Sequence, residues 1–455
     1  MLRPLLDIAT DDERFIALAA AVRDGGPVDA HASASIRPYL LAALLDSEPG
    51  LGGRPALAVA ADDVGARDLA RALGAYLAPR RVRYYPSRGT GYQSHLAPPP
   101  HLVGLRVGAL DALTEGAPEE PAVVVASAIA LAEAVPDASL RPEGFVLHRG
   151  EEVDLADVAE LLVEAGYERA DQVEERGHFA VRGGILDVFP ATEERAARLE
   201  LFGDEIETIR WFSTFTQRSL GEAERIELDP AAELALEHRE LAVVAAQDGE
   251  RPDVANLLPF ESFRAPLDLL RDDTAIVLAS AEEIEPALGD HWEDVTAAIH
   301  DDDARRLYVE VSTPLRDRAA LSLYAAPGAE AEPDSNDERR TTSHVFRAQA
   351  PTSAARTIAE AESQLERELR SGYRVAVTFE HRGEAERAQY NLNRVAAGFI
   401  DDPATADAVL HADRPERILL AEARLTDGFV SPDLRLAVIP FRRLVHRRRA
   451  AAPAP

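Results

Sequence analysis

The chain has 455 residues, a formal net charge of −31 and 46% hydrophobic residues. This length predicts about three domains of roughly 150 residues each. The acidic balance excludes nucleic-acid binding by the surface as a whole, because phosphate binding needs clustered cations. No cysteine is present, which excludes disulfides and thiolate chemistry. No apolar run reaches the ~18 residues of a membrane span, and the N-terminal segment becomes acidic too early for a secretory signal, so we expect a cytoplasmic protein with no membrane partner.

The basic residues are of one kind. All 49 are arginine, and lysine does not occur. A phosphate-binding loop of an ATPase needs a lysine ammonium that reaches the β- and γ-phosphates, and the planar guanidinium of arginine does not replace that compact charge. We therefore predict that this chain hydrolyses no ATP and holds no cofactor.

Strand and helix patterns alternate in the first part of the chain. Residues 11–23 form an amphipathic helical pattern, and residues 28–45 read as a strand, a loop and a helix. Strand patterns follow at Ala56–Ala61, Val82–Tyr85 and Ala122–Ala126, with helical patterns between them. The last of these strands is entirely apolar, which is typical of a strand buried on both faces. The alternation predicts an α/β layer with a parallel sheet.

The loop between the first strand and its helix lacks the features of a phosphate-binding loop. Ala30, Ala32 and Ala34 stand where glycines would be needed, and no lysine follows. Ser33 and Ser35 carry hydroxyl groups near the start of the helix, so we expect them to cap it rather than to bind an anion.

Residues 166–220 have a different pattern, that of a small antiparallel unit. Apolar and polar residues alternate from Phe179 to Arg182, and Gly183-Gly184 then supplies a turn. Further strand patterns follow at Ile185–Phe189, Arg198–Phe202 and Ile206–Phe212. Arginines recur along this unit, at positions 169, 182, 195, 198, 210 and 218.

Specific motifs lie in this unit. They read G-Y-x-R-x-D-Q-V, then G-x-F-A-V-R-G-G-I-L-D-V-F-P, then R-L-E-L-F-G-D-E-I-E-x-I-R-x-F and T-Q-R-S-L. Their order resembles the adaptor domain shared by the excinuclease protein UvrB and the transcription-repair coupling factor, and the ending leans towards the coupling factor. The resemblance implies a domain that binds the excinuclease protein UvrA. The segments R-Y-Y-P-S-R and V-V-V-A-S-A-I-A-L resemble landmarks of the degenerate helicase-like lobe of the coupling factor.

The resemblance implies the fold class and the domain layout. We expect a degenerate helicase-like (RecA-like) α/β lobe with a parallel sheet, an inserted, mostly antiparallel adaptor, and a second small α/β domain. After the adaptor, Arg225–Leu228 and Thr274–Ala279 are strand candidates of the returning lobe, and Glu282–Asp303 is an acidic helix. The expected layout is 1–144 for the lobe, 145–220 for the adaptor, 221–324 for the return, 325–344 for an acidic linker, 345–441 for the small domain and 442–455 for a basic tail.

The adaptor arginines are the candidate partner-binding residues. Arginine forks pair bidentately with carboxylates, so we predict that Arg169, Arg182 and Arg198 bind UvrA, with Phe189 as an apolar neighbour. The alternative is that these arginines only pair with nearby carboxylates such as Asp171 and Asp187.

Two further signals are weighed against simpler interpretations. Leu199–Glu205 imitates the acidic strand of a metal-dependent ATPase, but Gly203 interrupts the strand and favours a turn. A basic cluster near the C-terminus could contact nucleic acid or could lead on to a further domain. Its arginines are Arg442, Arg443, Arg447, Arg448 and Arg449. The segment before it resembles the third domain of the coupling factor, but the acidic ending of that motif is replaced by Phe441-Arg442-Arg443.

The resemblance thus implies the N-terminal part of a transcription-repair coupling factor. Its expected roles are recruitment of UvrA for nucleotide excision repair and restraint of the family's motor. RNA polymerase binding and ATP- and Mg²⁺-dependent movement on DNA belong to other domains of that family. The alternatives are a separate, UvrB-like ATP-dependent DNA helicase and a DNA-binding scaffold that acts through the basic cluster.

Overall fold

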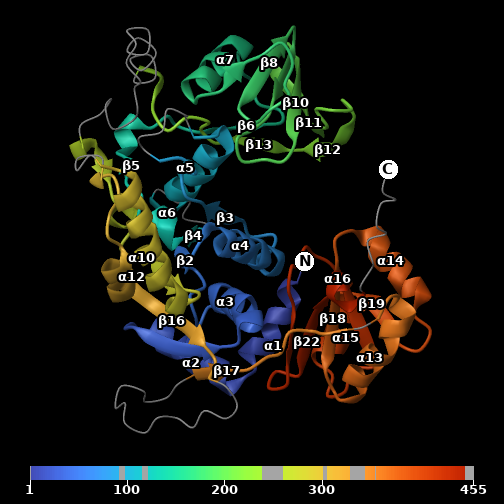
Figure 1. Cartoon of the computed structure of the whole chain (residues 1–455). Coiled ribbons are helices and arrows are strands. Elements are labelled where there is room, and N and C mark those ends of the chain that lie inside the picture. Colours follow the sequence, from blue (N-terminus) through green and yellow to red (C-terminus); the bar gives the residue numbers. More distant parts are fainter. Residues whose placement is uncertain are drawn as a thin grey trace, which may run out of the picture.

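A seven-stranded sheet, all of whose strands run parallel, is the centre of the first unit (Figure 1). The computed structural model describes residues 2–91, 98–114, 121–237, 260–300, 305–327, 344–353 and 355–445. From edge to edge, the strands are β17 (His344–Phe346), β1 (Val28–Ala32), β16 (Ala319–Ala325), β15 (Ala275–Leu278), β2 (Ala56–Ala60), β4 (Val123–Ser127) and β3 (Val82–Tyr85). Every residue of β2, β4 and β15 is buried, as expected for apolar strands covered on both faces.

Helices cover both faces of this sheet. One face packs against η1 (Arg3–Leu6), α1 (Asp7–Thr10), α2 (Glu13–Arg23), η2 (Ala34–Ile36), α3 (Arg37–Asp46) and α4 (Asp63–Leu77). The other face packs against α5 (Pro100–Thr114), α6 (Ala128–Leu131), η5 (Pro266–Leu269), α10 (Ala281–Ala298) and α12 (Ser312–Arg318). Short elements complete this side: β5 (Val135–Pro136), η3 (Ala138–Leu140), η4 (Phe260–Ser262) and β14 (Phe263–Arg264). The predicted α/β layer with a parallel sheet is confirmed.

The second unit is inserted between β4 and β15, since the chain leaves the seven-stranded sheet after β4 and rejoins it at β15. Its six-stranded sheet has the order β12 (Ser219–Ala223), β11 (Glu205–Phe212), β10 (Ala196–Phe202), β9 (Ile185–Val188), β8 (His178–Arg182) and β7 (Glu168–Arg169). Only the short β7 runs parallel to its neighbour. Helix α7 (Leu155–Glu164) begins at Asp154, whose carboxylate accepts the Ala156 N–H at 2.7 Å.

One strand predicted for the returning lobe lies in the inserted unit instead. Arg225–Leu228 is a strand, β13, but it pairs antiparallel with β6 (Phe145–His148) and not with the parallel sheet. Ile226 and Leu228 are buried in the same core as Phe179. The strand pattern alone does not specify which core receives the apolar residues.

The third unit is a five-stranded α/β layer. Its sheet has the order β19 (Ala396–Phe399), β20 (Arg417–Glu422), β18 (Arg374–Phe379), β22 (Leu436–Pro440) and β21 (Phe429–Ser431). All pairs are parallel except β21 with β22. Its helices are α13 (Ile358–Arg370), α14 (Arg382–Asn391), α15 (Pro403–Leu410) and α16 (Phe441–Leu444). The predicted second small α/β layer is present.

The first and third units share one hydrophobic core. Tyr39 of α3 is fully buried, donates its hydroxyl hydrogen to the Leu5 carbonyl oxygen at 2.7 Å, and lies 5.0 Å from the ring of Phe429 of β21. The same cluster joins residues of α2, α3 and α4 to residues of β20, β21 and β22. The two units also share backbone hydrogen bonds, because Gln349 forms an antiparallel bridge with Val430. They therefore lie side by side as one packed body (Figure 1).

The connection between these units corrects two sequence-based expectations. β17, placed by sequence at the start of the small domain, pairs with β1 in the seven-stranded sheet. Ser33, a predicted helix cap, instead accepts the N–H of Ala348, which follows β17, at 3.1 Å, and no cap bond from Ser33 is formed. Both differences arise because residues after the linker return to the end of β1. Most of the expected linker, residues 328–343, lies outside the described residues.

Two other expectations concern the acidic helix and membranes. The helix predicted at Glu282–Asp303 is α10, which ends at Ala298, and Asp301–Asp303 lie outside the described residues. In the part of the chain that the structure describes, no helix has the length and apolar character to cross a bilayer.

Because the first and third units share a core, we predict that a destabilising substitution in the third unit also destabilises the first unit. Phe429→Ala leaves a cavity among residues of both units, and we expect the free energy of unfolding to fall by about 3–5 kcal/mol. Urea unfolding followed by the fluorescence of Trp292, on α10, measures the change; Trp211→Phe makes Trp292 the sole tryptophan.

The matched control is Tyr390→Ala, because the Tyr390 side chain is 88% exposed. This control should change the free energy of unfolding by no more than about 0.5 kcal/mol. If Phe429→Ala left the Trp292 transition in place, the two units would unfold independently and the inference of a common core would be wrong.

Candidate partner-binding face of the inserted sheet

The inserted six-stranded sheet has two chemically different faces. Residues of one alternation, among them Phe179, Leu186 and Leu199, are buried in the core that includes α7. Residues of the other alternation form a second face, which we call the outer face. It carries a small apolar cluster, Val173, Ala180, Ala196 and Phe212, with Phe189 packed against it. Charged side chains surround this cluster, which is the arrangement expected of a sheet with one face towards solvent.

A row of charges crosses the outer face. The strand register places Asp187 of β9, Arg198 of β10, Arg210 of β11 and Glu222 of β12 beside one another. Arg198 forms a bidentate pair with Asp187, with Nε–Oδ1 at 2.6 Å and Nη2–Oδ2 at 2.8 Å. Arg210 pairs with Glu200. Each of these two guanidinium groups therefore has a carboxylate partner within the sheet.

Arg198 is held rigidly. Its guanidinium lies 4.8 Å from the centre of the Phe212 ring and donates to the Gln217 side-chain oxygen at 3.3 Å. The hydrogen bond to Asp187 raises the pKa of Arg198 above its ordinary value. Asp187 is buried, so loss of Arg198 would leave a buried carboxylate without its ion pair.

Arg182 differs from Arg198 in its exposure and in its hydrogen-bond partner. Its side chain is exposed at the end of β8, and its Nη2 donates to the backbone carbonyl oxygen of Asp171. In the part of the chain that the structure describes, Arg182 has no ion pair within 4.0 Å. A carbonyl oxygen orients the guanidinium but does not neutralise it. Relative to the described residues, Arg182 therefore presents a positive charge that no carboxylate within 4.0 Å neutralises.

Arg169 and Phe189 lie at different places relative to this face. Arg169 is exposed on β7, and its register partner is Phe179, whose side chain is on the α7 side of the sheet. Phe189 is half-buried beside the outer-face cluster, with the Arg176 guanidinium 5.7 Å from its ring centre. The structure thus gathers Arg182, Arg198 and Phe189 on one face and places Arg169 at the edge of the sheet.

Sequence reasoning missed two aromatic residues of this unit. Phe215 is 95% exposed in the turn between β11 and β12, and Phe202 is 81% exposed at the turn between β10 and β11. The Phe215 turn also carries Gln217, which reaches Arg198. The available signal was the position of each phenylalanine next to a turn, where no core can cover it. Gly203, with φ of +65°, makes the turn that the sequence favoured over a metal site at Leu199–Glu205.

Arginines of the first unit fix the segment by which the chain leaves the inserted unit. Arg83 of β3 donates to Glu227 at 2.5 Å and lies 3.9 Å from Asp229. Arg81 also pairs with Glu227, and Arg88 pairs with Glu233 at 2.9 Å. This seam joins the edge strand of the parallel sheet to the end of the inserted unit, so it orients the outer face relative to the first unit.

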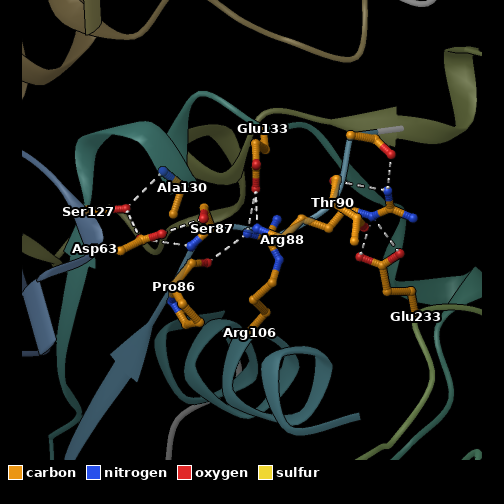
Figure 2. A network of polar contacts seen from close by, with 11 residues as sticks. Asp63, Pro86, Ser87, Arg88, Thr90, Arg106, Ser127, Ala130, Glu133 and Glu233 are labelled. Atoms are coloured by element: carbon orange, nitrogen blue, oxygen red, sulfur yellow. Dashed lines mark hydrogen bonds and ion pairs between the residues drawn. The ribbon is translucent and has the colours of Figure 1, made fainter. Parts of the chain in front are cut away.

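A buried carboxylate lies next to Arg88, the residue that pairs with Glu233 in this seam (Figure 2). Glu133 accepts the Arg88 backbone N–H and an Arg106 Nη1 hydrogen, both at 2.8 Å, and Arg106 also donates to the Pro86 carbonyl oxygen at 2.7 Å. Burial raises the pKa of Glu133 to about 7, although Arg106 opposes this shift. Beside it, Asp63 accepts hydrogen bonds from the Ser127 hydroxyl at 2.6 Å and the Ser87 N–H at 2.9 Å.

An arginine occupies the loop at which the strand–loop–helix pattern would place a phosphate site. Arg37 is buried and donates to the Ala32 and Ala279 carbonyl oxygens, both at 3.1 Å. It also donates to the Ser280 hydroxyl at 3.0 Å and pairs with Glu282 at 2.7 Å. Within the described ranges, no group of three or more histidine, aspartate or glutamate side chains is placed to hold a metal ion.

The basic cluster is only partly described. Arg442 is exposed at α16, and Arg443 pairs with Asp427. Arg447, Arg448 and Arg449 lie outside the described residues.

The raised pKa of Glu133 predicts a pH dependence of stability. A carboxyl group that binds its proton more tightly in the folded chain stabilises the fold below its ordinary pKa, and this contribution is lost as the pH rises through 7. Relative to Glu133→Gln, the wild type should lose up to about 1.4 kcal/mol per pH unit between pH 4.5 and 7. Free energies of unfolding measured for both chains across this range test the difference. Parallel pH profiles would contradict the buried, proton-binding state.

Comparisons with known proteins match the inserted unit. Residues 145–234 match the family described as the UvrB interaction domain, which extends beyond the predicted boundary at 220 and includes β13. The Transcription-repair-coupling factor of Bacillus subtilis (strain 168) is 33% identical over 171 residues, 37% of this chain and 14% of that protein. That of Myxococcus xanthus is 35% identical over 227 residues, 48% of this chain and 18% of that protein.

The chain is also similar to a UvrABC system protein B. The UvrABC system protein B of Streptococcus uberis is 33% identical over 167 residues, which is 36% of this chain and 25% of that protein. The chain thus spans a quarter or less of the length of these three curated relatives.

Proposed function

From the premise that this chain carries a UvrB interaction domain and is similar to transcription-repair-coupling factors, we propose that it acts as the UvrA-recruiting N-terminal region of such a factor. Its outer face would bind UvrA and bring nucleotide excision repair to stalled transcription. The observation that carries this proposal is the uncompensated guanidinium of Arg182 on a half-apolar sheet face.

The contacts on the outer face divide its arginines by role. Arg182 is exposed and has only a carbonyl partner, so its charge is available for a carboxylate of the partner. Arg198 is neutralised by Asp187, so we assign it to positioning the strands and the Phe215 turn. Phe189 and Phe215 supply apolar contact area towards the other end of β9 from Arg182, and aromatic and arginine side chains are typical of the residues that dominate protein interfaces. Arg169 would extend the contact around the sheet edge.

The first unit would serve as a rigid, non-hydrolytic support in a RecA-like arrangement. Its parallel sheet and the strand–turn–helix order of β1, η2 and α3 support this assignment. The Arg37 guanidinium and Glu282 occupy the end of β1, where an ATPase would need a lysine and free backbone N–H groups for phosphate. RNA polymerase, DNA, ATP and Mg²⁺ would then be contacted by other domains of the complete factor, in the cytoplasm.

Truncation of Arg182 should weaken UvrA binding. We expect Arg182→Ala to raise the Kd for UvrA about thirtyfold, which corresponds to about 2 kcal/mol, with no loss of stability. Arg169→Ala should have a smaller effect because Arg169 lies at the sheet edge. Arg198→Ala should lower both affinity and the free energy of unfolding, because Asp187 loses its ion pair. Titration against purified UvrA and urea unfolding separate these outcomes.

The control is Arg271→Ala, an exposed arginine of the first unit paired with Asp273, which should leave UvrA affinity unchanged. Wild-type affinity in the Arg169→Ala, Arg182→Ala double variant would remove the outer face as the docking site.

An assay of ATP hydrolysis separates this proposal from the alternative of a UvrB-like helicase, because a helicase would hydrolyse ATP. We expect no ATP turnover above background with or without single-stranded DNA. Arg37→Ala removes the guanidinium from the loop and should remain inactive, because no lysine is present to hold the β- and γ-phosphates. A coupled ATPase assay on both chains decides this. DNA-stimulated turnover by the wild type would favour the helicase alternative.

A further inference from the structure

A cavity of about 340 Å³ opens at the carboxyl ends of the strands in the third unit. It lies where β18, β20 and β22 end, and Thr378 and Pro440 are register partners on its floor. Its lining includes Thr378, Glu380, Glu384, Leu425, Phe441, Arg442 and Val445. The cavity is separate from the outer face of the inserted unit, because all its lining residues belong to the third unit.

The topology creates this cavity. After β18 the chain turns into α14, whose Ala385 and Ala388 pack on one side of the sheet. After β20 it crosses to the opposite side, where Leu425 joins the core shared with the first unit. Two neighbouring parallel strands whose connections leave on opposite sides form a crevice outside their carboxyl ends. In open α/β sheets this crevice is where ligands bind.

A polar side chain on the floor of the cavity lacks a partner. Thr378 is 2% exposed, and its hydroxyl has no hydrogen-bond partner among the described residues. A buried hydroxyl without a partner costs about 1–3 kcal/mol. A hydroxyl oxygen can accept hydrogen bonds as well as donate one, so a ligand that donates a hydrogen bond would remove this cost.

The rest of the lining specifies the charge and shape of the ligand. Glu380 and Glu384 place two carboxylates at the cavity and Arg442 places one guanidinium there, so the lining carries a net negative charge, which disfavours phosphate and other anions. Leu425, Phe441 and Val445 are apolar and suit a hydrocarbon arm. The Phe441 ring is stacked on Phe379 at 4.9 Å and so is held in place. A planar cation stacks on such a ring and pairs bidentately with a carboxylate.

We propose that this cavity is a binding site for a guanidinium group on an aliphatic arm, that is, an arginine side chain. Its fork would pair with Glu380 and Glu384, its donors would reach the Thr378 hydroxyl, and its arm would lie against Leu425 and Phe441. Arg442 is exposed and is itself part of the cavity lining, where its charge offsets one of the two carboxylates.

The arginine could come from two sources that share this chemistry. Arg447, Arg448 and Arg449 follow the lining residue Val445 in the sequence. A basic peptide of another protein would present the same group. The experiment therefore uses two full-length chains: the wild type and a chain with Arg447→Ser, Arg448→Ser and Arg449→Ser, called the tail-substituted chain.

The probe is N-acetyl-L-arginine amide, which carries a single charge, measured by calorimetry and by the methyl resonances of Leu425 and Val445. Its neutral isostere N-acetyl-L-citrulline amide should bind at least about tenfold more weakly, because the charge-assisted bonds are lost. Glu380→Gln with Glu384→Gln should weaken arginine binding by about tenfold or more. Thr378→Val should weaken it by about three- to tenfold. Glu386→Gln, on the same helix but outside the cavity lining, should change nothing.

Each outcome decides the proposal. Binding to both chains supports the site and assigns it to a separate basic partner. Binding to the tail-substituted chain alone supports the site and shows that the chain's own arginines occupy it. The proposal is overturned if neither chain binds the probe, if citrulline binds equally well, or if the glutamate substitutions have no effect.

Discussion

Buried and half-buried arginine side chains hold the ends of parallel strands in this protein. A guanidinium has five donors in a fixed plane, so one side chain can satisfy several carbonyl oxygens at once. Arg37 connects the ends of β1 and β15, Arg80 donates to the Leu45 and Pro121 carbonyl oxygens, and Arg106 joins Pro86 to Glu133. A lysine ammonium presents no such planar fork. A composition whose basic residues are all arginine therefore supplies the groups that fix this fold.

Arginine has two roles on the inserted sheet, and the group that accepts its hydrogen bonds determines which role each arginine has. A carboxylate neutralises Arg198 and makes it part of the sheet, whereas a carbonyl oxygen orients Arg182 and leaves its charge available. The seam from Arg81, Arg83 and Arg88 to the carboxylates after β13 then holds this face at a defined angle to the first unit. Recruitment of a partner through such a face needs no chemistry in the first unit, only a stable support.

Because of the shared core, the rigid body that supports the inserted sheet includes both the first and the third unit. Tyr39 and Phe429 bring the first and third units into one hydrophobic cluster, and β17 adds a strand from after the linker to the first sheet. The third unit is thereby fixed with its sheet's carboxyl ends and their cavity open to a ligand. The proposed arginine site would then sit on a rigid body that also carries the UvrB interaction domain.

The sequence by itself determined the local elements, the exclusion of lysine chemistry and the family of the inserted unit, because periodicity, composition and ordered motifs are properties of neighbouring residues. Val82–Tyr85 and Arg225–Leu228 are both strands, as their patterns predict. Only the tertiary structure decided that the second of these pairs with β6, that β17 joins the first sheet, and that Ser33 binds Ala348. It also decided which arginines are neutralised and that Thr378 faces a cavity. These facts depend on contacts between residues that lie from about ten to more than three hundred positions apart, and no local pattern encodes which segment supplies the partner.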